Sequence, residues 1–211
     1  MALPPTRVTL AGRYVRIVPV DPESHAPALY AGSRGPGHED LWRYLFNPPF
    51  PDEAAMREYL EQRSRAHDPL FFTILNSAGA PAGYASLMRI EPGHGVIEIG
   101  NILYLPALQR TAGATEAMYL FARYVFETLG YRRYEWKCDS LNEPSRRAAV
   151  RLGFTFEGIF RQHMILKGKN RDTAWYSMLD GEWPARKEAF ERWLDPANFS
   201  ADGRQRSPLS R

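Results

Sequence analysis

The sequence has very little cysteine and no long apolar run. Its single cysteine, Cys138, excludes a framework of internal disulfides and is compatible with a reducing compartment. No apolar run approaches the roughly 20 residues that cross a bilayer as a helix. The first six residues, Met-Ala-Leu-Pro-Pro-Thr, also lack the charged start and apolar core of a secretory signal peptide. These absences predict a cytoplasmic protein without a membrane segment.

Several common binding motifs are absent as well. The five histidines show no metal-ligand spacing, and the chain has neither a Walker A loop nor a G-x-G-x-x-G run. The formal net charge of +3 fits an anionic cofactor, but it fits the absence of one equally well. The basic residues are scattered rather than clustered with aromatics, which argues against a nucleic-acid partner. We therefore expect no metal and no nucleic acid.

The 211 residues contain no internal repeat, and this length favours one domain. Periodicity and turn residues predict strands at residues 13–20, 70–75, 83–90, 95–105, 131–139, 154–166 and 173–179. Helices are expected at residues 21–31, from residue 51, and at residues 112–129, 142–152 and 184–194. This mixed order indicates an α/β or α+β fold, with a mostly antiparallel sheet and two helical crossovers. We expect one domain over residues 1–199 and a polar, flexible tail over residues 200–211.

Glu98 is an isolated carboxylate in the apolar strand predicted at residues 95–105. Burial there would disfavour the charged form and move the carboxyl pKa towards that of a useful general base. A half-exposed strand position, or an ion pair with one of the many arginines, explains the same residue without a catalytic role. Gly100 follows two positions later and suggests a β-bulge that frees backbone donors for a ligand.

The loop at residues 108–115 leads into the longest predicted helix. A loop-to-helix junction presents free N–H groups and the positive end of the helix dipole, which favours a phosphorylated ligand. Small residues such as Gly113 would let that ligand approach the backbone, but packing in a strand-to-helix turn is the commoner reason for them. Within the helix, an apolar face with Met118 and Phe121 lies opposite Glu116 on the polar face.

The next predicted helix begins at Asn142, which is a good cap, and carries Ser145 in its first turn. A capping residue can also contact a ligand, because both use the exposed helix end. Cys138 and Trp136 share the apolar face of their predicted strand. This position favours a packed thiol over a nucleophile. His163 lies in a predicted strand, where a structural role is the commoner one.

With these elements in order, the sequence resembles the GNAT superfamily of N-acetyltransferases, and within it the branch of ribosomal-protein N-terminal acetyltransferases. The resemblance covers roughly residues 13–180. It is carried by five pieces in order: Glu98-Ile-Gly, Leu103-Tyr-Leu-Pro, Gln109…Ala114-Thr-Glu-Ala117, Asn142-x-x-Ser145 and Gly153-Phe154. Each piece is weak alone, and their order and spacing make the resemblance specific.

The resemblance implies a twisted, mostly antiparallel sheet whose central strands splay apart, with acetyl-CoA in the opening. Backbone groups of one strand would then hold the pantetheine arm, the loop and helix start would hold the pyrophosphate, and the next helix would contact the arm near the thioester. The cofactor-binding residues implied in this way are Leu103, Tyr104, Leu105, Gln109, Arg110, Thr111, Ala112, Gly113, Ala114, Thr115, Asn142 and Ser145.

The sequence departs from the family pattern at two places. The family's loop reads Gln/Arg-x-x-Gly-x-Gly/Ala, and its first glycine position is Ala112 here, so Gly113 falls one residue later. Many relatives also carry a tyrosine acid four residues after the position of Ser145, where this chain has Ala149. Ser145 is then the nearest candidate to protonate the leaving thiolate, and bulk water is the alternative.

The resemblance implies an acyl-CoA-dependent N-acyltransferase that moves acetyl from acetyl-CoA to a primary amine by direct attack. A base must take the amine's proton, and we assign Glu98 to that step. A non-catalytic acyl-CoA-binding or regulatory module on the same fold is the alternative. The acceptor stays open between a small-molecule amine and a protein N-terminus, and a homodimer is compatible with the sequence.

Overall fold

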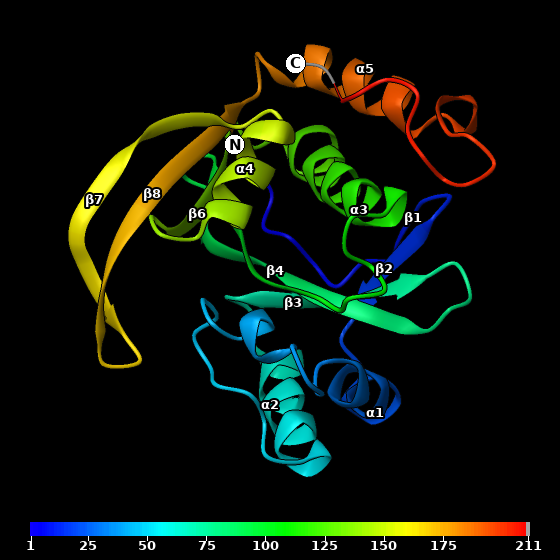
Figure 1. Ribbon diagram of the computed structural model, residues 1–211. Coiled ribbons are helices and arrows are strands. Elements are labelled where there is room, and N and C mark those ends of the chain that lie inside the picture. Colours follow the sequence, from blue (N-terminus) through cyan, green and yellow to red (C-terminus); the bar gives the residue numbers. More distant parts are fainter. Residues whose placement is uncertain (210–211) are drawn as a thin grey trace.

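The computed structural model describes residues 1–209 and contains one eight-stranded sheet in the order β1-β2-β3-β4-β5-β6-β8-β7 (Figure 1). The strands are β1 (Leu10–Ala11), β2 (Val15–Pro19), β3 (Leu70–Asn76), β4 (Pro81–Glu91), β5 (Val96–Tyr104), β6 (Arg133–Asp139), β7 (Thr155–Leu166) and β8 (Lys169–Leu179). Neighbouring strands are antiparallel except for β5 and β6. The predicted mixed fold with a mostly antiparallel sheet is confirmed.

Five α-helices connect and cover these strands. They are α1 (Pro22–Gly32), α2 (Glu53–Arg65), α3 (Ala112–Arg123), α4 (Glu143–Arg151) and α5 (Trp183–Leu194). Four of them begin where a short polar side chain accepts a hydrogen bond from a backbone N–H of the first turn. The capping residues are Asp21, Asp52, Thr111 and Asn142.

The helices form layers on both faces of the sheet. Figure 1 shows α1 and α2 on one face, α3 and α4 on the other, and α5 outside α3. The core under α1 and α2 includes Met56 and Tyr84, and the larger core under α3 includes Phe72 and Phe121, whose ring centroids are 5.6 Å apart. The two cores fix the sheet from both sides, so its central strands are rigid supports for a site.

The parallel ladder between β5 and β6 is short. Four residue pairs join the two strands, from Val96 opposite Arg133 to Ile99 opposite Trp136. Beyond Ile99, β5 continues to Tyr104 beside β4, while β6 continues to Asp139 beside β8. The two strands therefore diverge in the middle of the sheet, as the resemblance implied.

Helix α3 differs from the sequence prediction in two respects. The helical run expected to reach residue 129 changes to a π-helical turn at Tyr124–Thr128, and Gly130, with a φ of +71°, follows it. Glu116, expected on the polar face, is 5% exposed. Its carboxylate accepts backbone N–H bonds from Arg13 (2.8 Å), Tyr14 (2.6 Å) and Val15 (2.9 Å). Glu116 thus ties α3 to the start of β2.

The segment after α5 folds back on that helix. The Trp193 indole donates to Gln205 Oε1 at 2.8 Å, and Gln205 forms an isolated bridge with Phe199. Asn198 Oδ1 accepts a hydrogen bond from the Ser207 N–H at 2.9 Å. Residues 210–211 of the predicted flexible tail lie outside the described residues, and the domain boundary at residue 199 stays a prediction.

Replacing Glu116 with Gln should destabilise the protein. The amide has one acceptor oxygen in place of two, and its NH₂ group would face backbone donors, which leaves buried N–H groups unpaired. We expect the free energy of unfolding to fall by about 3 kcal/mol and the melting temperature by roughly 6–12 °C. Urea and thermal unfolding measure both quantities. The exposed pair residue Glu188 provides the control, since Glu188→Gln should change stability by less than about 0.5 kcal/mol.

Candidate active site

The divergence of β5 and β6 opens a cavity of about 1920 Å³. It extends from the start of α3, past the centre of the sheet, to the segment at residues 37–46 and to β7 and β8. Most of the sequence-predicted site residues line it: Glu98, Leu103, Tyr104, Gln109, Arg110, Thr111, Ala112, Ala114, Thr115, Asn142 and Ser145. The structure therefore brings the two predicted halves of the site, from β5–α3 and from β6–α4, to one cavity.

Leu105 and Gly113 are the two predicted site residues that do not line the cavity. Leu105 is buried in the core under α1. Gly113 faces the interior of the domain, where an added Cβ would lie 2.9 Å from Val15 Cγ1. This glycine therefore allows α3 to pack closely on β2, which is the packing explanation raised from the sequence.

The predicted irregularity in β5 falls at Asn101, directly after Gly100. Asn101 has a φ of +50°, and the β4–β5 register shifts between the pairs Ser86–Gly100 and Tyr84–Leu103. The Asn101 amide donates to Ser86 Oγ at 2.9 Å, and that hydroxyl donates to the Gly100 carbonyl at 3.2 Å. The bulge is thereby held in place, and it leaves Asn101 and its neighbour outside the regular ladder. Sequence reasoning found Gly100 but missed Asn101.

Glu98 lies on β5 at the point where the strands separate, and it is 4% exposed. Its Oε2 lies 2.9 Å from Lys137 Nζ and 3.0 Å from Arg89 Nε. Burial raises the pKa of the Glu98 carboxyl, while Lys137 and Arg89 act in the opposite direction and the net change is upward. The base predicted from the sequence is therefore both buried and ion-paired.

The two cations engage the same oxygen of Glu98. Both contacts are within ion-pair distance, yet neither aligns as a hydrogen bond, so Oε2 has no aligned donor. The Oε1 atom takes part in neither ion pair. One oxygen of Glu98 is thus held by charge, and the other remains available at the cavity wall.

The charges around Glu98 continue along the polar phase of β6. The Lys137 side chain, 4% exposed, also contacts Glu135 Oε2 at 2.6 Å and lies 3.8 Å from the Trp175 ring centroid. Arg133 Nε lies 2.7 Å from Glu135 Oε1. Both faces of β6 are therefore buried or half-buried. The apolar side chains lie under α3, and the charged side chains lie in this network.

Arg89 reaches Glu98 from an irregular position of β4. Its φ is +49°, in the left-handed region that few non-glycine residues adopt. The N–H groups of Arg89 and Ile90 both donate to the carboxylate of Asp68, at 2.9 and 3.0 Å. Asp68 therefore stabilises the irregular backbone that brings the Arg89 guanidinium to the site. No sequence signal indicated this arrangement.

The start of α3 presents the donors expected for an anion. Thr111 Oγ1 accepts from the Ala114 N–H at 3.2 Å, while the N–H groups at the first two helical positions have no partner within the helix. Tyr104 hydroxyl donates to the Ala114 carbonyl at 3.0 Å, which joins β5 to α3. Arg151 Nη1 donates to Thr115 Oγ1 at 3.1 Å and brings a cation to the same region.

The start of α4 forms the opposite wall. Asn142 Oδ1 accepts from the Ser145 N–H at 3.2 Å, and Ser145 Oγ accepts from the Trp136 indole at 3.0 Å. The bond from Trp136 uses a lone pair of Ser145 Oγ, so the hydroxyl can still act as a donor. Cys138 is 6% exposed, and burial raises the pKa of its thiol, with Ser145 acting in the opposite direction. A neutral thiol is a poor nucleophile, so Cys138 suits a packing role.

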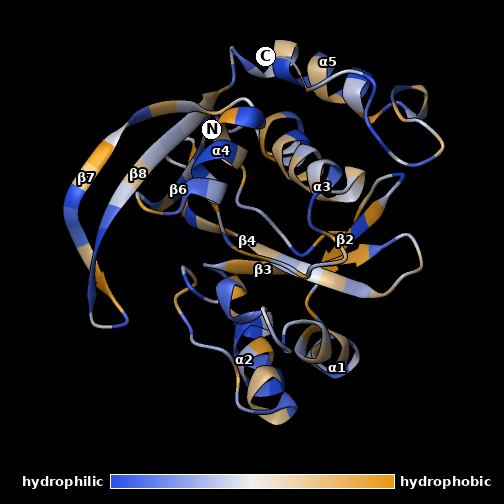
Figure 2. Ribbon diagram, viewed as in Figure 1, coloured by the Kyte–Doolittle hydropathy of each residue, from blue (hydrophilic) through white to orange (hydrophobic). Residues whose placement is uncertain are grey.

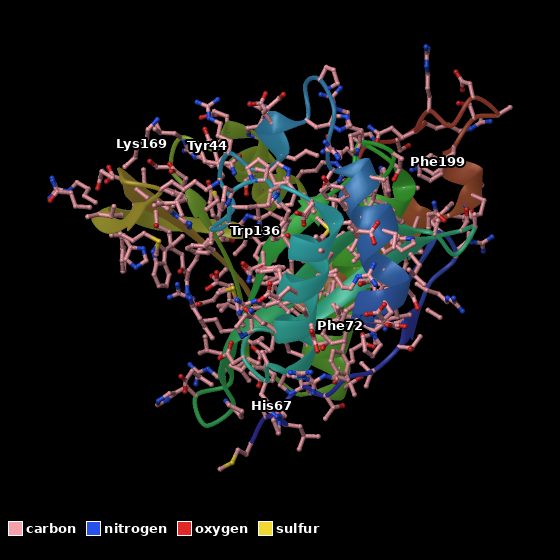
Figure 3. All side chains as sticks on the ribbon, turned by 90° about the horizontal axis from the view of Figure 1, so that it is seen from below. Tyr44, His67, Phe72, Trp136, Lys169 and Phe199 are labelled. Atoms are coloured by element: carbon pink, nitrogen blue, oxygen red, sulfur yellow. The ribbon has the colours of Figure 1, made fainter. Side chains whose placement is uncertain are left out.

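The far end of the cavity is bounded by the segment at residues 37–46. Tyr44 hydroxyl donates to the Leu141 carbonyl at 3.0 Å, and Lys167 Nζ donates to the Trp42 carbonyl at 2.6 Å. These bonds connect the segment to the β6–α4 loop and to the tip of the β7–β8 hairpin. Figure 3 shows Tyr44 near the part of this hairpin that carries Lys169.

The cavity thus has three chemically different parts. The α3 start and Arg151 suit a phosphorylated ligand, the bulge at Asn101 offers backbone groups, and Glu98 is a carboxylate with a raised pKa at the centre. The part bounded by residues 37–46 has room for a second substrate. This arrangement suits a group transfer in which a base removes a proton from the acceptor.

Comparison with known proteins agrees with this geometry. The family described as "Acetyltransferase (GNAT) domain" matches residues 15–155, which is more than half of the chain. A GCN5-related N-acetyltransferase from Brucella melitensis is 50% identical, with a TM-score of 0.96 over 99% of this chain and 95% of that chain. The crystal structure of the Microcin C7 self immunity acetyltransferase MccE in complex with acetyl-CoA and AMP is 21% identical, with a TM-score of 0.70 over 80% of this chain and 93% of that chain. At that identity the MccE likeness shows the fold alone.

A curated relative points to the branch that the sequence resembles. The "Putative ribosomal N-acetyltransferase YdaF" of Bacillus subtilis is 29% identical over 52% of this chain. The match spans 59% of the length of YdaF. Together with the family match and the Brucella structure, these findings establish that the chain belongs to the GNAT acetyltransferase family.

Proposed function

We propose that the protein transfers an acetyl group from acetyl-CoA to a primary amine by direct attack, without an acyl-enzyme. The observation that carries this proposal is the position of Glu98, a buried carboxylate with a raised pKa at the point where β5 and β6 separate. The crystal structure of MccE with acetyl-CoA supports the choice of cosubstrate, because that protein shares the fold.

The residues at one end of the cavity fit the phosphates of acetyl-CoA. The free N–H groups of Ala112 and Gly113 at the start of α3 would bind the pyrophosphate, with Arg151 nearby as a cation. Leu103 and Tyr104 on β5 would hold the pantetheine arm, and Asn142 would contact it from α4. Acetyl-CoA supplies an acyl group that is activated as a thioester.

Two side chains, Glu98 and Ser145, and the bulge would carry the transfer. The free Oε1 of Glu98 would accept the proton of the amine, directly or through one water. Backbone N–H groups at the Asn101 bulge would stabilise the negative charge that develops on the acyl oxygen. Ser145, oriented by Trp136, would donate its hydroxyl proton to the departing thiolate. Cys138 would take no covalent part.

A non-catalytic acyl-CoA-binding module is the second candidate, and amine-dependent release of free CoA thiol separates the two. An acetyltransferase releases thiol when a pool of primary amines is added, whereas a binding module does not. The pool includes small amines and a peptide with a free N-terminus, because the relative YdaF is named a putative ribosomal N-acetyltransferase. If no amine in the pool causes release of CoA thiol, the enzymatic proposal is contradicted.

Cytoplasmic location and a homodimer stay predictions of the sequence. Among residues 1–209, no helix combines the length and the apolar character that a membrane crossing requires.

A charge placed at the first residue of α3 tests the phosphate site. Ala112→Glu adds a carboxylate beside the proposed phosphates, yet an acidic residue suits a helix start, so the fold should tolerate it. We expect the Kd for CoA to rise about tenfold, which corresponds to about 1.4 kcal/mol. Titration calorimetry measures it, with Ala112→Gln as the control of equal size. Equal weakening by both variants would point to steric blocking instead of charge.

Replacing Glu98 with Gln tests the general base. The amide keeps the shape but does not accept a proton, so kcat should fall by about 10²–10⁴-fold, while the Kd for CoA should change little. Because burial raises the Glu98 pKa, the wild-type rate should increase with pH as the carboxyl ionises. The defect of Glu98→Gln should shrink at high pH, where more of the amine is already deprotonated.

His163 is the control for this assignment, because it also lines the cavity and its Nδ1 lies 2.9 Å from Thr173 Oγ1. His163→Gln should retain most of the turnover. The opposite pattern would assign the base to His163: a folded Glu98→Gln variant with near-normal activity and a His163→Gln variant with a large loss.

Removing the thiol tests direct transfer. Cys138→Ala should retain the turnover and should lose about 1–2 kcal/mol of folding stability, since the change leaves a small cavity next to Trp136. Steady-state thiol release and thermal unfolding measure the two effects. Two results together would show an acyl-cysteine route. A folded Cys138→Ala protein would be inactive, and mass spectra would show acetyl bound covalently to the wild-type protein.

A further inference from the structure

Arg171 is a buried cation that faces the cavity. It lies on β8 opposite Met164 of β7, is 6% exposed, and lines the end of the cavity away from α3. Its guanidinium carbon lies 5.5 Å from the ring centroid of Phe46, which belongs to the segment that bounds this end. Burial lowers the pKa of Arg171, as expected where a positive charge has lost water.

Arg171 has no charged partner within the part of the chain that the structure describes. It forms no ion pair, and its buried Nε has no hydrogen-bond acceptor. Three other cations near Glu98 are paired: Arg89 and Lys137 with Glu98, and Arg133 with Glu135. Arg171 is therefore the buried cation near Glu98 that has no ion pair among the described residues.

The acidic residues whose charge reaches Arg171 form no ion pair with it. They are Asp139 and Glu98. Asp139 Oδ1 accepts from the Leu141 N–H at 2.9 Å, and Glu98 contacts Lys137 and Arg89. A second cation, Arg89, also acts on Arg171 and makes the surroundings more positive.

A buried cation without an ion pair is costly for folding, because it has lost water and carboxylates at a distance compensate its charge only in part. This cost to folding is explained if a bound ligand supplies the missing anion. A guanidinium matches a carboxylate or a phosphate particularly well, since its N–H groups form a fork. The open side of Arg171 faces the cavity, in the same region as the proposed base, Glu98.

The boundary of this end favours a small acceptor. The segment at residues 37–46 is connected across the cavity by the Tyr44–Leu141 and Lys167–Trp42 hydrogen bonds. A folded protein's terminus would have to displace these bonds to reach Arg171, whereas a small molecule would not.

From these observations we propose that the acceptor is a small amine with an anionic group, a carboxylate or a phosphate, which pairs with Arg171 while the amine lies at Glu98. This inference rests on the proposed acetyltransferase function and names the substrate class of the same site. Arg171 then selects the acceptor and holds it, and Glu98 accepts its proton.

The kinetic test compares matched acceptors with and without the anion. The panel contains free amino acids and the corresponding amino acid amides, with phosphoethanolamine and ethanolamine as the phosphate pair. Wild-type protein should prefer an anionic member of a pair by about 30-fold or more in kcat/KM. Arg171→Met should abolish this preference mainly through a higher KM, Arg171→Lys should restore part of it, and the KM for acetyl-CoA should stay unchanged.

The matched control is Arg161→Met, because Arg161 is an exposed cation on the same hairpin. This variant should keep the wild-type preference. Equal rates with the neutral and anionic members of every pair, or a preference that survives in Arg171→Met, would overturn the proposal. Faster turnover of peptides than of every small amine would overturn its small-molecule form.

A second measurement needs no turnover. In thermal unfolding with CoA present throughout, phosphate should raise the melting temperature of wild-type protein and of Arg161→Met, but not that of Arg171→Met. Without phosphate, Arg171→Met should melt at the same temperature as wild type or higher, since it removes an unpaired buried charge. A large decrease in the melting temperature of Arg171→Met would instead show that Arg171 is structural, and would overturn the assignment.

The proposal for Arg171 and the proposed enzymatic function fail in different ways. If no amine causes release of CoA thiol, the acetyltransferase function is contradicted, while the effect of phosphate on the melting temperature still tests Arg171.

Discussion

The short parallel ladder between β5 and β6 is the constraint on which the site depends. Four residue pairs hold the strands together, and beyond Ile99 each strand has a different antiparallel neighbour. The irregular backbone at Asn101 lies just beyond the end of this ladder, and the Ser86 hydroxyl holds that irregularity in place. The cavity is therefore part of the sheet itself, and it does not need a separate domain or a moving loop. The central part of the cavity wall belongs to strands that are packed on both faces.

Buried charge is concentrated where the strands separate. Glu98, Lys137 and Glu135 lie side by side with Arg89 and Arg133 around them, and their attraction compensates much of the cost of removing them from water. Within this network Glu98 keeps a raised pKa, because burial outweighs its two cations. A base that is held in place by charge on one oxygen and free on the other combines a fixed position with the capacity to accept a proton.

The two ends of the cavity differ in how they present positive charge. At the α3 end, backbone N–H groups and Arg151 offer a diffuse positive field that suits phosphates. At the other end, Arg171 offers a single buried guanidinium beside an aromatic ring. In the proposed reaction, Glu98 lies between the cosubstrate at the α3 end and the acceptor at the Arg171 end. A direct transfer requires this order, because both substrates must meet at the base.

The sequence by itself determined the mixed fold, the order of the elements and most of the cavity wall. Local signals explain that success: Asp21, Asp52 and Asn142 stand just before helical patterns and cap those helices, and Glu98 is conspicuous in an apolar strand. Tertiary structure decided the rest. Glu116 looks like a surface residue on its helix, and only the arrival of β2 from a distant part of the chain makes it a buried acceptor of three backbone bonds. Gly113 looks like a glycine that leaves room for a ligand, but the space beside its Cα is filled by Val15. Arg171 was one arginine among many, because charge is paired or unpaired only after folding has brought its neighbours together.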